Sequence, residues 1–206
     1  MTTLPKSLFW IRTDTEGADH ALLDDGRGLR AKGVAVAATP IPYTCRYELV
    51  TDETWATVRL EVSAEGAGWR RTVRLERATG RWRVVTGEQG NLDRALAAAG
   101  QRPVGLPGCE DPDRLADAVD VDLAAAPLFN TLPVRRLGLL GAAAGTGHQL
   151  TVVFVRLPSL EVAPVEQHYT ALGDGRAQFR SGTFTAELTL DPDGYVTHYP
   201  GLARRP

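Results

Sequence analysis

The chain has 206 residues, enough to bury most of its apolar surface in a single domain, and 43% of these residues are hydrophobic. Its 23 basic and 25 acidic residues give a formal net charge of −2, which argues against nucleic acid as a partner because a phosphate backbone normally requires a basic face. Residues 8–11 are the one apolar run near the start and are too short for a signal peptide or a membrane span, so we expect a cytoplasmic protein without a transmembrane segment.

Alternation of apolar and polar side chains with a period of two is the dominant pattern along the chain. Residues 57–64 and 183–190 divide most clearly into two faces, with Val58 and Leu60 on the apolar face of the first and Phe184 and Ala186 on that of the second. Such segments are typical of half-buried antiparallel strands. The pattern predicts strands at 7–12, 18–24, 28–38, 43–51, 55–64, 69–77, 81–86, 119–124, 133–140, 149–157, 162–171, 176–181, 184–190 and 195–199.

Short segments that contain glycine separate many of these strands, which predicts tight hairpin turns and therefore a meander topology. They lie at 25–28, 65–68, 79–80, 173–175 and 191–194.

Residues 91–118 break the alternation and predict a short helical insertion, with alanine-rich runs at 92–99 and 112–118. Asn91 and Asp111 are suitable helix N-caps, and Gly100 is a suitable helix stop. Residues 141–147 form a flexible connection that lacks the Gly-Lys-Ser/Thr ending of a phosphate loop, so a nucleotide site is not expected there.

Polar side chains gather in two short segments flanked by apolar residues, at 120–123 and 130–137. Buried polar groups need partners, so these residues form either a structural network or a binding site. On one strand Asp120 and Asp122 would share a face, about 6.6 Å apart along the chain. The adjacent Arg135 and Arg136 would point to opposite faces of an extended chain, which leaves one for an acidic partner and the other for the surface or a ligand.

The side chains of these segments suit an amphiphile. A guanidinium binds carboxylates, phosphates or vicinal hydroxyls, amides and hydroxyls bind sugar hydroxyls, and aromatic rings pack against lipid or sugar rings. In the strand-like run at 167–169, Gln167 and Tyr169 would face one way and His168 the other. The predicted ligand-binding residues are Asp120, Asp122, Asn130, Thr131, Arg135, Arg136, Gln167 and Tyr169.

A structural interpretation competes with this site and is the stronger of the two. The acids and arginines would then form an ion-pair network that holds a sheet seam together, with Asn130 bonding to local backbone. Trp10, Trp55 and Trp82, which could line an inner surface, would be ordinary core residues.

No metal or cofactor is predicted, because the four histidines are scattered without the spacing of metal ligands. Cys45 is in phase with the apolar Tyr43 and Tyr47, which predicts a buried thiol, and Cys45 and Cys109 are expected to stay reduced.

The chain resembles the bacterial family of putative glycolipid-binding proteins. The resemblance covers nearly the whole chain and is most specific at Asp-Val-Asp-Leu (120–123) and Asn-Thr-Leu-Pro-Val-Arg-Arg-Leu (130–137), with further matches at 167–169 and 190–202. It implies an all-β fold in which one strongly curved antiparallel sheet forms a spiral β-roll, and residues 1–206 would make up one such domain. It also implies a glycolipid or similar amphiphile as the ligand.

Three functions stay open. The first is a non-catalytic protein that holds a lipid-like ligand in the concave side of the curved sheet. The second is a hydrolase that cleaves a glycosidic or ester bond with Asp120 and Asp122, although neighbours on one strand point in parallel whereas catalytic carboxylates flank the scissile bond. The third is a structural or protein-interaction module that uses exposed sheet edges. The identity of the ligand and the oligomeric state are not predicted.

Overall fold

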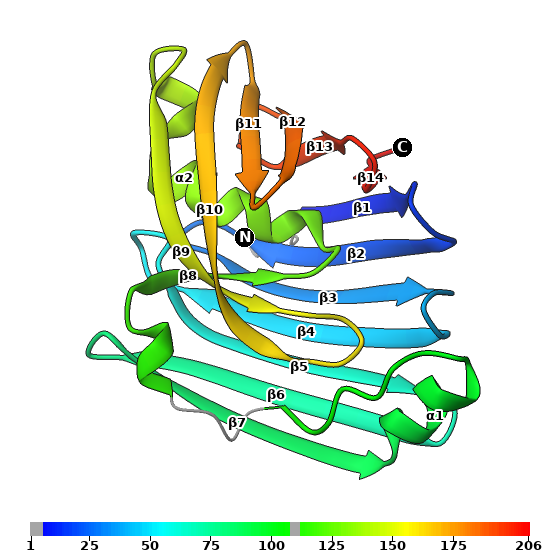
Figure 1. Cartoon of the computed structure of the whole chain (residues 1–206). Coiled ribbons are helices and arrows are strands. Elements are labelled where there is room, and N and C mark those ends of the chain that lie inside the picture. The colour runs from blue at the N-terminus through cyan, green and yellow to red at the C-terminus, as the bar shows by residue number, and fades with distance from the viewer. Residues whose placement is uncertain (1–5, 108–111) are drawn as a thin grey trace, which may run out of the picture.

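Fourteen strands form one sheet in the computed structural model, which describes residues 6–107 and 112–206 (Figure 1). The strand order is β7-β6-β5-β4-β3-β2-β1-β14-β13-β12-β11-β10-β9-β8, and β8 and β9 form the one parallel pair among the paired strands described. The prediction of an all-β fold with a single strongly curved, mainly antiparallel sheet is therefore confirmed. The strands are β1 (Lys6–Arg12), β2 (Gly17–Asp24), β3 (Arg30–Ala37), β4 (Tyr43–Thr51), β5 (Thr57–Gly66), β6 (Trp69–Ala78), β7 (Arg81–Gly90), β8 (Ala118–Leu123), β9 (Gly147–Val155), β10 (Val162–Gly173), β11 (Arg176–Ser181), β12 (Phe184–Leu190), β13 (Val196–Tyr199) and β14 (Ala203–Arg204).

The helical insertion lies where the sequence predicted it, but it is shorter. Helix α1 (Leu92–Ala98) begins at Asn91, whose side chain accepts a hydrogen bond from the backbone N–H of Arg94 at 2.7 Å. It ends before Gly100, which has a φ of +72° that suits glycine. The second run contributes only the 3-10 helix η1 (Pro112–Leu115), while Asp111 and Cys109 lie outside the described residues.

The strand predicted at 133–140 is wrong. This region contains the 3-10 helix η2 (Pro127–Asn130), helix α2 (Thr131–Arg136) and the 3-10 helix η3 (Leu139–Gly141). Pro133 lies in the first turn of α2, where its missing N–H costs nothing because first-turn donors have no partner within the helix. Gly138, with a φ of +65°, then ends α2 and precedes η3.

The two faces of β5 also differ from the prediction at its start, because Thr57 is buried and Val58 is 41% exposed. A β-bulge is the cause: Val50 pairs with Arg59 and Thr51 with Thr57, so Val58 has no partner on β4. A bulge shifts the alternation by one residue, which turns Thr57 toward the interior. The regular alternation is restored from Leu60 onward.

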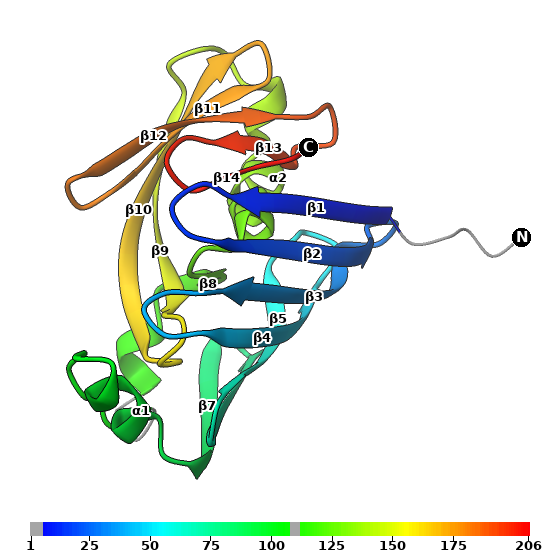
Figure 2. The same cartoon turned by 90° about the vertical axis from the view of Figure 1, so that its right-hand side faces the viewer.

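The sheet curls so far that its last strands face its first ones. Figures 1 and 2 show β9 and β10 bending across the concave side of the wall formed by β1 to β7. The edge strand β8 is held against that wall by side chains: Trp82 Nε1 donates to the carbonyl of Ala118 at 3.0 Å, and Thr57 Oγ1 accepts from the N–H of Val121 at 3.3 Å. The sheet therefore forms an unclosed roll.

Side chains fill the concave side of the β1–β7 wall. Phe129 of η2 is buried there, and its ring packs edge-on against Tyr47 with ring centroids 5.3 Å apart. Trp10, Trp55 and Trp82 belong to the same hydrophobic core and are 0%, 7% and 4% exposed. The tryptophans are thus core residues, and this part of the concave side does not provide the expected acyl chamber. Cys45 is fully buried in this core, as predicted.

The two halves of the sheet are joined through β14, which is only two residues long. Ala203 and Arg204 pair with Arg12 and Ile11 of β1 on one side, and with two residues of β13 on the other. A strand this short supplies few ladder hydrogen bonds, so the seam needs additional contacts.

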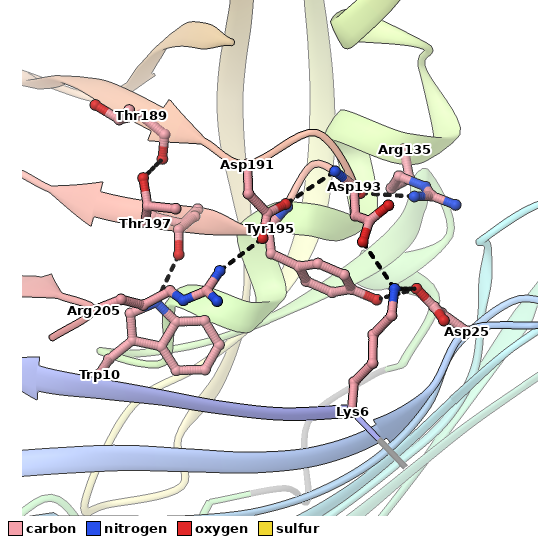
Figure 3. Close-up of polar contacts among 11 residues, drawn as sticks. Lys6, Trp10, Asp25, Arg135, Thr189, Asp191, Asp193, Tyr195, Thr197 and Arg205 are labelled. Atoms are coloured by element: carbon pink, nitrogen blue, oxygen red, sulfur yellow. Dashed lines mark hydrogen bonds and ion pairs between the residues drawn. The ribbon is translucent and has the colours of Figure 1, made fainter. Parts of the chain in front are cut away.

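Those contacts come from a side-chain network that we call the seam clamp, formed by Lys6, Trp10, Asp25, Asp193 and Tyr195 (Figure 3). Lys6 Nζ donates to Asp25 at 2.8 Å and to Asp193 at 2.9 Å, and the hydroxyl of Tyr195 donates to Asp25 at 2.9 Å. Trp10 Nε1 donates to a backbone carbonyl of β13 at 2.7 Å. The clamp ties β1 and the turn after β2 to the turn before β13.

Candidate functional site

Strand β8 presents Asp120 and Asp122 on the side opposite Val121 and Leu123, which belong to the hydrophobic core. This is the arrangement predicted from the period of two. The environments of the two acids differ, however, and the difference decides which of them can meet a ligand.

Asp120 is sealed in an ion pair. Its side chain is fully buried, and both of its oxygens accept from Arg136: Oδ1 from Nε at 2.9 Å and Oδ2 from Nη2 at 2.6 Å. Burial raises the pKa of Asp120, and the hydrogen bonds from Arg136 oppose that rise. The pair joins β8 to the end of α2, so an acid and an arginine do form an ion pair as the structural interpretation expected, but it links a strand to a helix and does not hold a sheet seam.

Asp122 belongs instead to a chain of polar side chains. Asn130 Nδ2 donates to the hydroxyl of Tyr169 at 2.8 Å, and this hydroxyl donates to Gln167 Oε1 at 3.3 Å. Gln167 Nε2 then donates to Asp122 Oδ2 at 2.6 Å. Burial raises the pKa of Asp122 to about 6, because its partner is a neutral amide that stabilises the charge only weakly. Four of the predicted site residues thus converge, from β8, η2 and β10.

A pocket of about 270 Å³ opens onto this polar chain, and Asp122, Asn130 and Gln167 are among the residues that line it. The volume is just below the range of about 300–1,000 Å³ typical of ligand pockets. It suits part of an amphiphile, such as one headgroup, better than a whole one. The remaining lining includes a loop of small residues, 124–126, and a group of aromatic side chains.

Aromatic rings form one wall of the pocket. The ring centroids of Phe179, Phe184 and Tyr199 lie 6.0–6.2 Å from one another, and Tyr169 packs against Phe179 at 5.2 Å. Phe154 of β9 also lines the pocket. Phe184 is 47% exposed although it lies on the apolar side of β12. An aromatic ring left this accessible at the edge of a polar pocket is available to a ligand.

Five of the predicted residues lie outside the pocket lining: Asp120, Thr131, Arg135, Arg136 and Tyr169. Thr131 is fully buried, and its hydroxyl has no hydrogen-bond partner among residues 6–107 and 112–206. Arg135 points to the seam, where it donates to the carbonyl of Asp193 at 2.7 Å and its guanidinium lies 4.4 Å from the ring centroid of Trp55. Arg136 is occupied by Asp120. One arginine therefore pairs with an acid and the other does not, as predicted. Their side chains diverge because they are neighbours on a helix, not because they lie on an extended chain.

Sequence reasoning missed the aromatic wall. Alternation placed Phe184 on an apolar strand face, and the same pattern describes an ordinary core residue. Phe179 lies on β11 and Tyr199 on β13, the two strands that pair with β12, so the register of three neighbouring strands brings the rings together.

Other hollows lie on the outer face of the sheet, where they have volumes of about 370 and 440 Å³. Their linings include Arg46, Glu61 and Arg74 in one and Lys32 and Glu48 in the other. Mixed charges of this kind are typical of a solvated strand face, and neither hollow contains a predicted site residue. The pocket beside Asp122 is therefore a better candidate than either of these two hollows.

Comparisons with known proteins agree on the family and the fold. A model of the family described as "Putative glycolipid-binding" matches residues 7–205. A crystal structure of a DUF1089 family protein from Pseudomonas aeruginosa superposes with a TM-score of 0.70 and covers 95% of both chains at 24% sequence identity, a likeness that shows the fold. A search of curated proteins found no match. No helix within the described part of the chain is long and apolar enough to span a membrane.

Proposed function

We propose that this chain, which belongs to the family of putative glycolipid-binding proteins, binds a glycolipid-like amphiphile at the pocket beside Asp122 and leaves it chemically unchanged. The observation that carries the proposal is the junction of a polar floor and an aromatic wall in one pocket. An amphiphile has the same two parts, a hydroxyl-rich head and an apolar tail.

The polar floor would bind the headgroup. Asp122 and Asn130 retain oxygens that accept no hydrogen bond from the described residues, and sugar hydroxyls could donate to both. The internal bonds from Asn130 to Tyr169 and from Tyr169 to Gln167 hold the floor in place before a ligand arrives. A site held in this way loses little entropy on binding, which favours affinity.

The apolar part of the ligand would lie along Phe184 at the pocket edge rather than beneath the β1–β7 wall. The interior under that wall is already filled by Tyr47, Phe129 and the tryptophans. A volume of about 270 Å³ also leaves no room for a long acyl chain beside the headgroup. Phe184 is therefore the residue on which the tail would first pack.

The acid pair gives little support to hydrolysis of the ligand. Both oxygens of Asp120 accept hydrogen bonds from Arg136, whereas a catalytic acid or base must reach the reacting atoms. Asp120 and Asp122 also lie on one strand and do not face each other across a gap. The binding function needs no contribution from Asp120 beyond fixing β8 against α2.

Two experiments test the proposal. Organic extraction of the purified protein followed by mass spectrometry should release a bound amphiphile. Isothermal titration calorimetry with octyl glucoside below its micelle concentration should then detect binding to the unloaded protein.

A pair of phenylalanine variants would locate the site. Phe184→Ser should weaken octyl glucoside binding about tenfold, because loss of a buried aromatic contact costs about 1.5 kcal/mol or more. Phe9→Ser is the matched control, since Phe9 is 43% exposed on the other side of the sheet, on β1. The proposal would be contradicted if no amphiphile were extracted and octyl glucoside did not bind, or if the two substitutions had equal effects on binding.

A further inference from the structure

The charge of the pocket is one-sided. Asp122 is the one residue with a formal charge at neutral pH among the described residues that line it. The guanidinium groups that could have neutralised it are engaged elsewhere, Arg136 by Asp120 and Arg135 by the carbonyl of Asp193. The carboxylate therefore has a neutral amide, from Gln167, as its hydrogen-bond donor.

We propose that the pocket selects an amphiphile whose headgroup carries a protonated amine, such as an amino sugar, over neutral and anionic headgroups. This inference rests on the proposed function and narrows its ligand class. An ammonium group offers three hydrogen-bond donors and a positive charge, which complement a carboxylate that has no cationic partner.

The aromatic wall supports the same choice. Phe179 and Tyr199 line the same pocket as the carboxylate, with their ring centroids 6.0 Å apart, which leaves the exposed Phe184 for the tail. A cation within about 6 Å of an aromatic centroid is attracted to the ring face, and the attraction grows when water is excluded. A phosphate, sulfate or carboxylate would instead meet the negative charge of Asp122 with no basic side chain in the lining to offset it.

The neighbouring titratable groups leave Asp122 as the charge that a ligand meets. Burial raises the pKa values of Tyr169 and Tyr199 well above the ordinary value, so both hydroxyls stay neutral. Asp120 is paired with Arg136. The pKa of Asp122, about 6, is that of a carboxylate without a cation beside it, and a bound ammonium would lower this pKa by favouring the charged form.

The test compares four octyl glycosides that differ in one substituent: glucosaminide with a free amine, its N-acetyl form, glucoside and glucuronide. Calorimetry at pH 7.5 should give at least about tenfold tighter binding of the glucosaminide than of the glucoside, the size expected for about 1.4 kcal/mol of added attraction. The glucuronide should bind most weakly. The N-acetyl form, which lacks the charge, should bind like the glucoside.

Two variants assign the preference to the carboxylate. Asp122→Asn should bind the glucosaminide and the glucoside equally. Glu166→Gln is the control, because this substitution also removes one negative charge, but from the outer face of β10, the strand that carries Gln167. It should keep the preference of the unaltered chain. The preference should also fall as the pH drops through 6 and be largely lost by pH 5 in the unaltered chain, a measurement that does not depend on the folding of a variant.

The outcomes separate the two proposals. Equal binding of all four glycosides, or tightest binding of the glucuronide, would overturn the amine preference while leaving amphiphile binding in place. Persistence of the preference in Asp122→Asn would overturn the assignment of the preference to this pocket. Failure of all four to bind would overturn the proposed function and this inference with it.

Discussion

Asp19 on β2 is a fully buried carboxylate, and replacing it by asparagine should change the pH dependence of stability. Its oxygens accept from the hydroxyl of Tyr47 at 3.1 and 3.4 Å. Burial outweighs this hydrogen bond and the positive charge of Arg12, and it raises the pKa of Asp19 from 3.8 to about 7. The folded chain therefore holds a proton that the unfolded chain releases.

The magnitude follows from the two pKa values. Stability gained from protonating Asp19 is fully present below pH 3.8 and is lost as the pH rises through 7. The whole effect amounts to about 4 kcal/mol, of which about 2–3 kcal/mol falls between pH 5 and pH 8. Asp19→Asn removes this dependence, so the variant should gain about 2–3 kcal/mol relative to the unaltered chain over that range.

Urea unfolding at pH 5, 6, 7 and 8 measures the difference. A constant offset between the two proteins is not diagnostic, because the new amide hydrogens need acceptors at every pH. The change of the difference with pH is diagnostic. Glu48→Gln provides the control, since Glu48 lies next to Tyr47 on the exposed side of β4 and its ion pair with Lys32 should contribute little. Parallel pH profiles for the Asp19→Asn variant and the unaltered chain would refute the reasoning.

Three further predictions concern other buried groups. Arg136→Met should destabilise the fold by about 3–5 kcal/mol because it leaves Asp120 charged and unpaired, and adding Asp120→Leu should recover most of the loss in urea unfolding. Gly33→Ala should destabilise the fold by about 1–3 kcal/mol and so lower the melting temperature, because the Cβ of the new alanine would lie 2.0 Å from the ring of Tyr47. An unchanged melting temperature would show that the ring can move. Binding of octyl glucosaminide should weaken about five- to tenfold from pH 7 to pH 5 as Asp122, with a pKa of about 6, becomes protonated, and a flat calorimetric profile would count against its role.

The strands were predictable because their signals are local. Alternation and glycine turns identify β4, β11 and β12 with their observed bounds, since each hairpin depends on a few adjacent residues. The predictions failed where the local pattern is compatible with more than one structure. The apolar spacing at 133–140 also fits a helix, and the bulge at Thr57 is set by pairing with β4 rather than by the sequence of β5 itself.

The candidate site was predictable only in its polar half. Asp122 and Gln167 drew attention because acids and amides among strand-forming residues need partners. Which of the two acids would meet Arg136 depended on the position of α2, and the helix was not predicted. The 47% exposure of Phe184 could not be predicted, because alternation places this residue on the apolar side of its strand and does not tell a covered position from an open one.

The two-residue strand β14 makes the order of synthesis matter. Hairpins from β1 to β7 can form as soon as each pair of strands has been made. The other edge of β1 has no partner until Ala203 and Arg204 have been made, near the end of the chain. Until then, the backbone of β1 offers a template to any other nascent strand. Because β14 pairs only with Ile11 and Arg12, unfinished copies of the chain would expose this end of β1 to pairing with one another.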